Sequence, residues 1–371
     1  MVQTIRNILR MLYAFIERFI MILRITPPYG GWLCNIKDLT YYPEERHHKT
    51  SYHILWDQIY HIARYGEVNK FYYLYGLDIA GKSFSQKGLL AYRTFMEQRN
   101  DRNYTRPYSY VCILRNKELF SLVCNHYGFR CVSNLGILNR SGNCLMDNGE
   151  EKNISQMLDT YPHLFFKPLD TECGEGIFCI DKLSDNDYTW DDKAITYREI
   201  ENRISNLAGD VLVQTRVIQH QEMQKLYPHS INTLRIVTIV KNGNAKYFSS
   251  VLRIGANGQI VDNWAVGGIA VCINTDGSLS NYGFMKPPFG KRMTCHPDTN
   301  VQFGTFVVPY FQEAVSLCEK LHEKLCNIWA IGWDVAITPN GPLFIEGNDN
   351  WEISLLQLEK GLKKQWDEFR K

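Results

Sequence analysis

The sequence lacks the features that identify several large classes of protein. Lys and Arg (41 residues) nearly balance Asp and Glu (39 residues), so no global electrostatic field would attract nucleic acid or a strongly acidic partner. The 11 cysteines are odd in number and include neither a CxxC pair nor a Cys/His cluster at zinc spacing. We therefore expect reduced thiols in a cytoplasmic protein that binds no nucleic acid.

No apolar run at the N-terminus is long enough to span a membrane. Residues 1–25 carry an apolar stripe at helical spacing, but four arginines interrupt it, and a span needs roughly 20 apolar residues. No small-residue cleavage site precedes Pro27-Pro28, so a secretory signal is not expected. Two alternatives remain: a helix packed on the body or on a partner, which the stripe favours, or a basic amphipathic helix lying on an anionic bilayer. The stripe consists of Ile5, Leu9, Leu12, Ile16, Phe19 and Leu23, and the arginines are Arg6, Arg10, Arg18 and Arg24.

The common nucleotide-binding signatures are also missing. The segment HLFFKPLDTECGEGIFCI at 163–180 predicts two strands around a loop that contains Gly174 and Gly176. No GK[ST] follows the loop and no helix opens behind it, so it is neither a P-loop nor a Rossmann fingerprint. Small residues in such a loop nevertheless let backbone N–H groups approach phosphate oxygens, and Lys167 would stand beside them at a strand end. This predicts a contact with an α- or β-phosphate.

The most informative stretch that is present is IWAIGWDVAITPNGPLFIEGNDNW, at 328–351. It predicts a hairpin of two strands, 330–338 and 343–347, because Pro-Asn-Gly-Pro at 339–342 is strong turn chemistry. The turn brings Asp334 near Glu346, and Asn348 can reach the same place. Two carboxylates and an amide oxygen in apolar surroundings suit Mg²⁺. The alternative is that Asp334 caps a turn and Glu346 is solvated at a strand end.

A cation also lies within an apolar strand. Arg235 sits between Leu234 and Ile236 in SINTLRIVTIV, at 230–240. A guanidinium there needs an anion, and its planar fork suits phosphate or carboxylate. A structural ion pair with an acid elsewhere in the chain is the alternative to a catalytic role.

The pattern GWDVAIT-x-x-GP-x-x-x-EGN at 332–348 resembles the metal-binding end of the ATP-grasp superfamily. In particular it resembles the sugar-transfer-associated ATP-grasp proteins, which are found near surface-polysaccharide genes in bacteria. The resemblance covers roughly 110–351 and includes F-F-K-P at Lys167. It implies an α+β ATP-grasp fold, in which two subdomains clasp ATP and the positions of Asp334, Glu346 and Asn348 hold Mg²⁺ or Mn²⁺.

The resemblance also implies nucleotide contacts. Lys117 matches a lysine at a helix start and is a candidate phosphate ligand, although an exposed helix-terminal lysine is an equal alternative. The strand at 211–218 matches the hinge whose backbone binds the adenine edge. This chain has Gln214-Thr215 where the family usually has Gln-Glu, so recognition there would rest on the backbone. The implied adenine and ribose contacts are Gln214, Thr215, Val217 and Glu222.

Further positions are implied to be catalytic. Asn232 and Arg235 belong to a run that resembles the family's N-T-L-R. Asn263 resembles the Asn that precedes a Gly-Gly pair in amino-acid-adding ATP-grasp ligases, and Gly268 would let the main chain approach a ligand closely. His296 lies in H-P-D-T, which resembles a family motif and suggests acceptor binding, although a turn cap is an adequate alternative.

These expectations combine into one hypothesis. The chain would have a helical N-terminal region (1–105), a nucleotide-binding subdomain (106–215) and a catalytic subdomain (216–371). It would be an ADP-forming ligase that joins a small carboxylate to an amine or other nucleophile through an acyl phosphate. Its substrates would be sugar-linked or cell-envelope precursors. A small-molecule kinase and a non-catalytic nucleotide-binding partner of a glycosyltransferase are the alternatives, and the oligomeric state is open.

Overall fold

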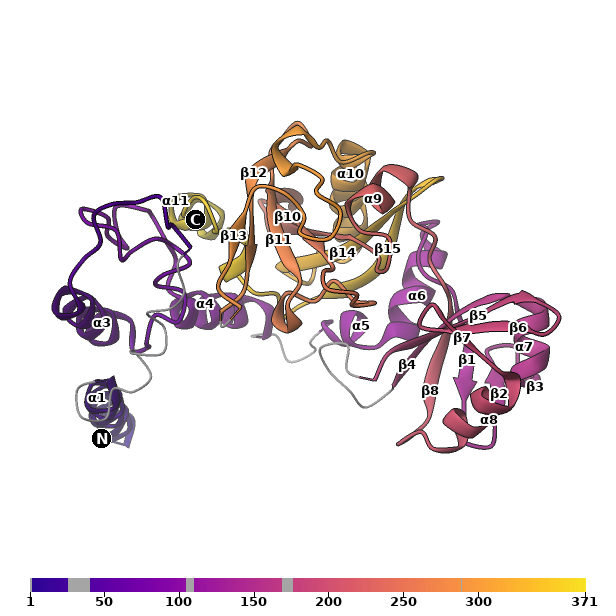
Figure 1. Cartoon of the computed structure of the whole chain (residues 1–371). Helices are drawn as coiled ribbons and strands as arrows, with labels where there is room; N and C mark the ends of the chain where they lie inside the picture. Colours follow the sequence, from indigo (N-terminus) through magenta and orange to yellow (C-terminus); the bar gives the residue numbers. More distant parts are fainter. Residues whose placement is uncertain (1, 26–40, 105–109, 169–175, 288) are drawn as a thin grey trace. The chain divides into compact units, whose positions relative to one another are not determined.

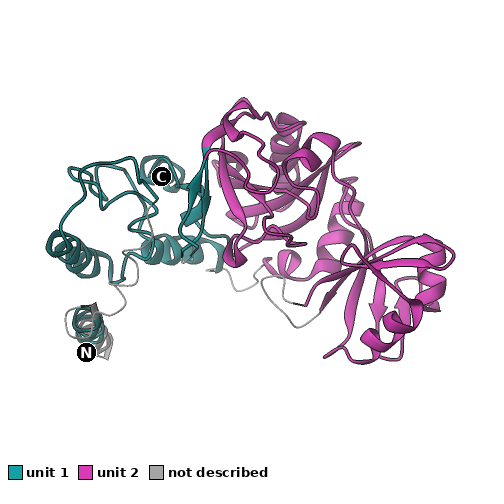
Figure 2. Ribbon diagram, in the orientation of Figure 1, with its two compact units in different colours: residues 1–109, 282–293, 351–371 teal, residues 110–281, 294–350 magenta. Residues whose placement is uncertain are grey.

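The computed structural model describes residues 2–25, 41–104, 110–168, 176–287 and 289–371. The chain forms two compact units (Figure 2). Unit 1 comprises residues 1–109, 282–293 and 351–371, and unit 2 comprises residues 110–281 and 294–350. Among the described helices, none combines the length and the apolar content that a membrane span requires. The division into regions 1–105, 106–215 and 216–371 stays a prediction.

Unit 1 is mainly helical (Figure 1). Rings from distant parts of the sequence form its core: Phe95 lies 4.8 Å from Trp351 and 4.9 Å from Trp366, centroid to centroid. The buried Gln357 amide donates to the Leu90 carbonyl and accepts from its N–H, so the C-terminal segment is fixed to the N-terminal one. The elements of unit 1 are α1 (Val2–Ile25), α3 (Ser51–Tyr65), α4 (Tyr92–Tyr104), β13 (Arg292–Met293), η3 (Ser354–Leu356) and α11 (Lys363–Arg370), with most of β12 (Leu279–Met285).

Unit 2 contains an eight-stranded antiparallel sheet in the order β3-β2-β1-β8-β4-β5-β6-β7. Its core includes a stack of three rings, with Phe178 lying 4.7 Å from Phe166 and 4.3 Å from Trp190 at nearly parallel angles. The strands predicted around the glycine loop are confirmed as β4 and β5, which pair from His163↔Asp181 to Phe166↔Phe178. The strands are β1 (Asn134–Leu138), β2 (Asn143–Met146), β3 (Glu151–Asn153), β4 (His163–Pro168), β5 (Phe178–Ser184), β6 (Asp187–Trp190), β7 (Lys193–Ile195) and β8 (Val211–Thr215).

The second sheet of unit 2 contains the order β11-β10-β9-β14-β15. These strands are β9 (Thr233–Lys241), β10 (Asn244–Ile254), β11 (Ile269–Ile273), β14 (Ala330–Thr338) and β15 (Gly341–Asn348). The helices of unit 2 are α5 (Cys112–Arg115), α6 (Lys117–His126), α7 (Ile154–Thr160), α8 (Tyr197–Ser205), α9 (Gln221–Leu226) and α10 (Phe311–Lys324), with the short turns η1 (Trp264–Val266) and η2 (Phe303–Thr305). Of these, α10 packs on β9 and β10.

The predicted hairpin is confirmed, with β15 beginning two residues earlier than expected. Gly341 follows the turn with a φ of 94°, a conformation that side chains with a Cβ rarely adopt. Asp334 lies opposite Glu346, but the next pair is Val335 with Phe344, so β15 carries an extra residue at this point. This bulge turns Phe344 toward Trp333, 5.5 Å away, while Glu346 lies opposite Asp334.

Candidate functional site

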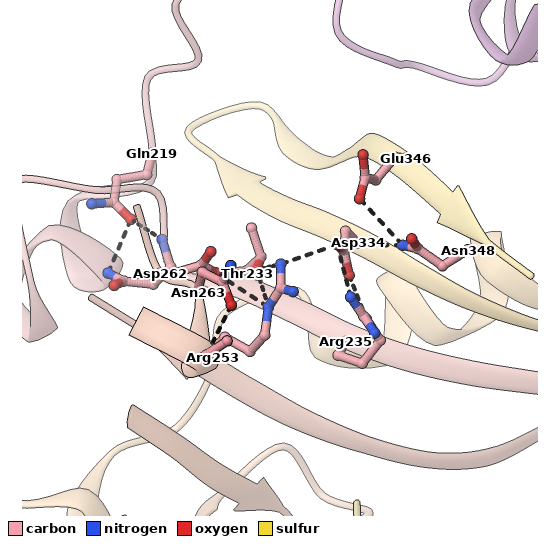
Figure 3. A network of polar contacts seen from close by, with 11 residues as sticks. Gln219, Thr233, Arg235, Arg253, Asp262, Asn263, Asp334, Glu346 and Asn348 are labelled. Carbon is pink, nitrogen blue, oxygen red and sulfur yellow. Dashed lines mark hydrogen bonds and ion pairs between the residues drawn. The ribbon is translucent and has the colours of Figure 1, made fainter. Parts of the chain in front are cut away.

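Three charged side chains form a row across neighbouring strands. Arg235 on β9 lies opposite Asp334 on β14, which lies opposite Glu346 on β15. The Arg235 guanidinium binds Asp334 through two bonds, Nε to Oδ1 at 2.6 Å and Nη2 to Oδ2 at 3.1 Å. Figure 3 shows Asp334 at the centre of this network. An anionic partner was expected for Arg235. The structure shows that this partner is Asp334, which is also a predicted metal ligand.

A second arginine approaches Asp334 from β10. Arg253 Nη2 donates to Asp334 Oδ2 at 3.0 Å and to the Thr233 hydroxyl at 2.7 Å. That hydroxyl donates to Asp262, which also accepts the Thr233 N–H at 3.1 Å and lies 3.5 Å from Arg253 Nε. The two buried acids are thus joined through one arginine and one threonine (Figure 3).

Burial and the neighbouring arginines together determine the pKa of Asp334 and of Asp262. Burial disfavours the ionised form of Asp334, whose side chain is only 3% exposed, but Arg235 and Arg253 outweigh burial and lower its pKa. At Asp262 burial outweighs the attraction of Arg253 and the bonds from Thr233, and the pKa is raised. Of these two buried acids, Asp334 is therefore the one whose ionised form the folded chain favours.

The predicted metal ligands converge. Asn348 Nδ2 lies 3.5 Å from Asp334 Oδ2 and 3.4 Å from Glu346 Oε1. A carboxylate offers about four lone-pair sites, and the arginines use three at Asp334. A half turn of the Asn348 amide would present its oxygen instead. No three His, Cys, Asp or Glu side chains among the described residues could hold a metal ion. The donors therefore fit Mg²⁺ only if Asn348 is the third ligand.

Lys167 reaches the same place from the eight-stranded sheet. Its ammonium lies 3.5 Å from Glu346 Oε2, and the two side chains are 20% and 25% exposed. Lys117 lies close to Lys167: burial, followed by the positive charge of Lys167, lowers the pKa of Lys117 to about 8. Two ammonium groups thus lie near one carboxylate, with which Lys167 forms the ion pair, and this arrangement favours a further anion.

Local structure positions Lys117. Asn116 caps α6 by accepting the Leu119 N–H at 3.0 Å, so the helix begins at Lys117. The Asn134 amide donates to the Lys117 carbonyl at 3.4 Å and accepts from the Gln214 amide at 2.7 Å. Gln214 therefore supports the backbone of Lys117 through one intermediate residue.

The other predicted nucleotide contacts lie along and after β8. Thr215 ends the strand opposite Leu164 of β4. The strand β8 ends at Thr215, three residues earlier than predicted. Val217 follows the strand and is half-buried. Glu222 forms an ion pair with Lys225 at 2.6 Å. Gly176 has a φ of 72°, as expected in a tight loop, while Gly174 lies outside the described residues.

Two predicted catalytic residues make their contacts elsewhere. The buried Asn232 amide donates to the carbonyls of Met223 and Tyr227, at 2.8 and 3.0 Å. His296 is fully buried: Nε2 donates to the Gly255 carbonyl at 2.7 Å, and Nδ1 accepts the Asp298 N–H. Burial lowers the pKa of His296 and favours this neutral form. These contacts stabilise loops, and a catalytic or acceptor-binding role for either residue stays a prediction.

The turn after Asp262 places Asn263 and Gly268 beside the network. Asn263 caps η1 by accepting the Ala265 N–H at 2.9 Å, and its carbonyl accepts the Gly268 N–H at 3.1 Å. A Cβ on Gly268 would lie 2.6 Å from the Asp262 carbonyl oxygen. Glycine is thus required at position 268, because the backbone of Asp262 leaves no room for a Cβ atom.

Sequence reasoning did not single out Arg253, Asp262 or Thr233 as site residues. Arg253 lies in SSVLRIG, an apolar strand interrupted by one arginine, which is the signal that marked Arg235. Arg253 could have been identified in the same way as Arg235, because each is a cation within an apolar strand. Nothing local marks Thr233 or Asp262, because strand pairing brings them together.

The sequence of the chain matches the model of a known protein family. The model of the family described as Sugar-transfer associated ATP-grasp matches residues 96–371. The fold is therefore that of the ATP-grasp proteins. Within that class, the chain belongs to the sugar-transfer associated ATP-grasp family. No curated protein sequence matches it.

Several solved structures are similar to the chain. They include an ADP complex of N5-carboxyaminoimidazole ribonucleotide synthetase (TM-score 0.37, 10% identity, 66% of this chain and 47% of that one). The biotin carboxylase domain of Hydrogenobacter thermophilus 2-oxoglutarate carboxylase has a TM-score of 0.35 and 13% identity, over 66% of this chain and 41% of that one. D-alanine–D-alanine ligase from Bacillus anthracis has a TM-score of 0.35 and 11% identity, over 69% and 62%. The chain spans less than two thirds of each.

Proposed function

We propose that this protein is an ATP-dependent ligase. ATP would transfer its γ-phosphoryl group to a small carboxylate, with loss of ADP, and an amine or other nucleophile would then displace phosphate from the acyl carbon. One observation carries the proposal: Lys167 pairs with Glu346, which lies opposite the arginine-bound Asp334, and Lys117 lies beside Lys167. Phosphoryl transfer depends mainly on positioning and on neutralising charge, and this cluster offers both.

Asp334, Glu346 and Asn348 would hold Mg²⁺, with Mn²⁺ as a substitute. The ion would supply neutralisation of the phosphate oxygens and polarisation of the transferred group. The arginines contribute separately, since Arg235 and Arg253 fix both oxygens of Asp334 and keep it ionised. No rearrangement of Asp334 would then be needed when substrates bind.

Lys117 and Lys167 would bind the phosphate groups of the nucleotide. Lys117 loses its proton more readily than an ordinary lysine because it is buried beside a second ammonium group. A bound phosphate would offset that repulsion and restore the charge of Lys117. Gln214 would act as a positioning residue, because it holds Asn134 against the Lys117 carbonyl.

The family description favours a sugar-linked substrate, so we propose precursors of surface polysaccharide or the cell envelope as the substrate class. We propose that the reaction takes place in the cytoplasm, where ATP is supplied. The nine described cysteines are all free thiols, as a reducing compartment would keep them.

The function is tested by ADP release from the full-length chain. Sugar-linked carboxylates are supplied with Mg²⁺-ATP, with and without an amine, and the products are identified by mass spectrometry. A ligase gives ADP, phosphate and an amide, and the amide requires both substrates. A stable phosphorylated product formed without the amine would identify a kinase instead. ATP binding without turnover for any carboxylate would contradict the proposal.

A further inference from the structure

Helices α1 and α3 of unit 1 expose large apolar side chains that the site in unit 2 does not use. Along α1 from Leu12 to Leu23, seven such side chains are 44 to 71% exposed. On α3, Tyr52, Trp56 and Tyr60 are 53 to 68% exposed. We call the first set the outward face of α1 and the second the aromatic stripe of α3. The outward face consists of Leu12, Tyr13, Phe15, Ile16, Phe19, Ile20 and Leu23.

The orientation of α1 is the reverse of that expected for a core helix. Glu17, the one acid in residues 1–25, forms an ion pair with Arg93 of α4 at 3.2 Å, and Arg18 lies beside Gly66 at the end of α3. The half-buried positions in the described part of the helix are Ala14, Glu17, Arg18, Met21 and Ile22, so its inward face combines charged and apolar side chains. Packing of the predicted stripe on the body is wrong for its described members Leu12, Ile16, Phe19 and Leu23, which are 46 to 54% exposed.

The aromatic stripe of α3 is part of a well-formed helix. Thr50 caps the start, Gly66 caps the end, and Ile54 and Ile62 are buried in unit 1. Tyr52, Trp56 and Tyr60 follow one another at intervals of four, so they lie along one side. The rings of Tyr52 and Trp56 are 6.1 Å apart and nearly perpendicular. Unit 1 thus presents aromatic side chains on a fixed scaffold.

Charge distinguishes these faces from an ordinary protein contact. The two acids in the described part of α1 and in α3 are both neutralised, Glu17 by Arg93 and Asp57 by Lys49. Arg24 and Arg64 are exposed near the ends of the two helices. In sequence, residues 1–25 carry four arginines and one acid. A cationic helix with an apolar face, next to Trp and Tyr, is the composition of segments that lie in the headgroup region of anionic membranes.

We propose that the outward face of α1 and the aromatic stripe of α3 bind the surface of an anionic lipid bilayer. The apolar side chains would enter the boundary between headgroups and acyl chains, Trp56 and the tyrosines would lie at headgroup level, and the arginines would bind lipid phosphates. This inference is independent of the proposed ligase function.

The test is sedimentation of the full-length chain with vesicles. Phosphatidylcholine vesicles are compared with vesicles that also contain phosphatidylglycerol. The double variants Phe15→Ser/Phe19→Ser and Trp56→Ser/Tyr60→Ser should each reduce partition into anionic vesicles by about tenfold or more, since each removes two large apolar groups. Arg24→Gln/Arg64→Gln should reduce binding to anionic vesicles only. Leu145→Ser/Leu183→Ser, at similarly exposed positions in unit 2, is the matched control and should bind like the wild type.

Unchanged melting temperatures would show that the variants fold. A wild-type chain that stays in the supernatant with both kinds of vesicle would overturn the proposal. A second result would also overturn it: light scattering gives the mass of a dimer for the wild type and that of a monomer for Phe15→Ser/Phe19→Ser. The apolar surface would then bind a second copy of the chain and not a membrane. Equal binding by all variants would equally overturn it.

Discussion

The two charge clusters of unit 2 differ in how completely the folded chain satisfies them. Around Asp334, two guanidinium groups bind one buried carboxylate through three hydrogen bonds. Around Lys167, the ammonium groups of Lys167 and Lys117 lie near Glu346, and Lys167 forms a partly exposed ion pair with it at 3.5 Å. With Asp262, which lies 3.5 Å from Arg253 Nε, the first cluster holds two acids for two arginines, whereas the second holds one acid for two lysines. We infer that the Asp334 cluster stabilises the fold in addition to its proposed part in holding Mg²⁺, and that the Lys117–Lys167 cluster contributes mainly to binding.

Asp334→Asn should give the largest change in stability. The substitution leaves Arg235 buried without a counterion and Arg253 with Asp262 alone, and broken buried pairs cost roughly 3–5 kcal/mol. Chemical denaturation of the ligand-free protein measures this loss. Glu346→Gln, at the more exposed end of the row, should change the unfolding free energy by less than about 1 kcal/mol. Equal losses in the two variants would remove the distinction between the clusters.

Lys167→Ala should leave stability nearly unchanged and weaken nucleotide binding. It removes a charge-assisted phosphate contact worth about 1.5–3 kcal/mol, which corresponds to roughly 10- to 150-fold in Kd. Isothermal titration with Mg²⁺-ATP measures the affinity. Lys182→Ala is the control, because Lys182 lies in the same sheet and pairs with Asp159. Wild-type affinity in the Lys167 variant would exclude this side chain from the nucleotide site.

Lys117 should make nucleotide binding depend on pH. Its pKa is about 8 in the ligand-free protein, and a bound phosphate would raise it. Binding near pH 8 should therefore be accompanied by proton uptake, and affinity should fall as the pH rises above 8. Titrations in two buffers of different ionisation enthalpy measure the uptake. It should disappear in Lys117→Arg, because arginine stays charged, and remain in the control Lys193→Arg.

The same residue has an opposite effect on folding. Because the pKa of Lys117 is lower in the folded chain than in the unfolded one, its charge opposes folding at pH values below about 8. That cost is relieved as the pH rises toward the unfolded pKa. Lys117→Met should therefore raise the melting temperature at pH 7 and have little effect near pH 10.5. An equal shift at both pH values would show that the effect is not electrostatic.

The sequence predicted local features well, and pairing between distant strands less well. Pro339-Asn340-Gly341-Pro342 determined the hairpin and hence the approach of Asp334 to Glu346. The bulge in β15 could not be predicted, because alternation of side chains alone would place Phe344 and Glu346 on one face. Thr233 and Asp262 were missed since they meet only through the fold.

Periodicity also has a limit at the N-terminus. It located the apolar stripe that includes Leu12 and Phe19, but it could not show which way the stripe faces. The structure shows that direction: the inward side carries Glu17, which pairs with Arg93, 76 positions away in the chain. Family motifs have a similar limit: His296 occupies a motif position, yet both of its ring nitrogens are engaged in a buried loop.

The measurement that tests the central claim most directly is a set of thermal melts of the wild type and Glu346→Gln, with and without Mg²⁺ and ATP. We predict that the melting temperatures of the two ligand-free proteins differ little, as a change of less than about 1 kcal/mol in the unfolding free energy implies. ATP with Mg²⁺ should raise the wild-type value more than ATP with EDTA, and Glu346→Gln should lose this metal-dependent part. An equal metal-dependent rise in both proteins would contradict the account, because Glu346 would then hold no metal and serve only as the partner of Lys167.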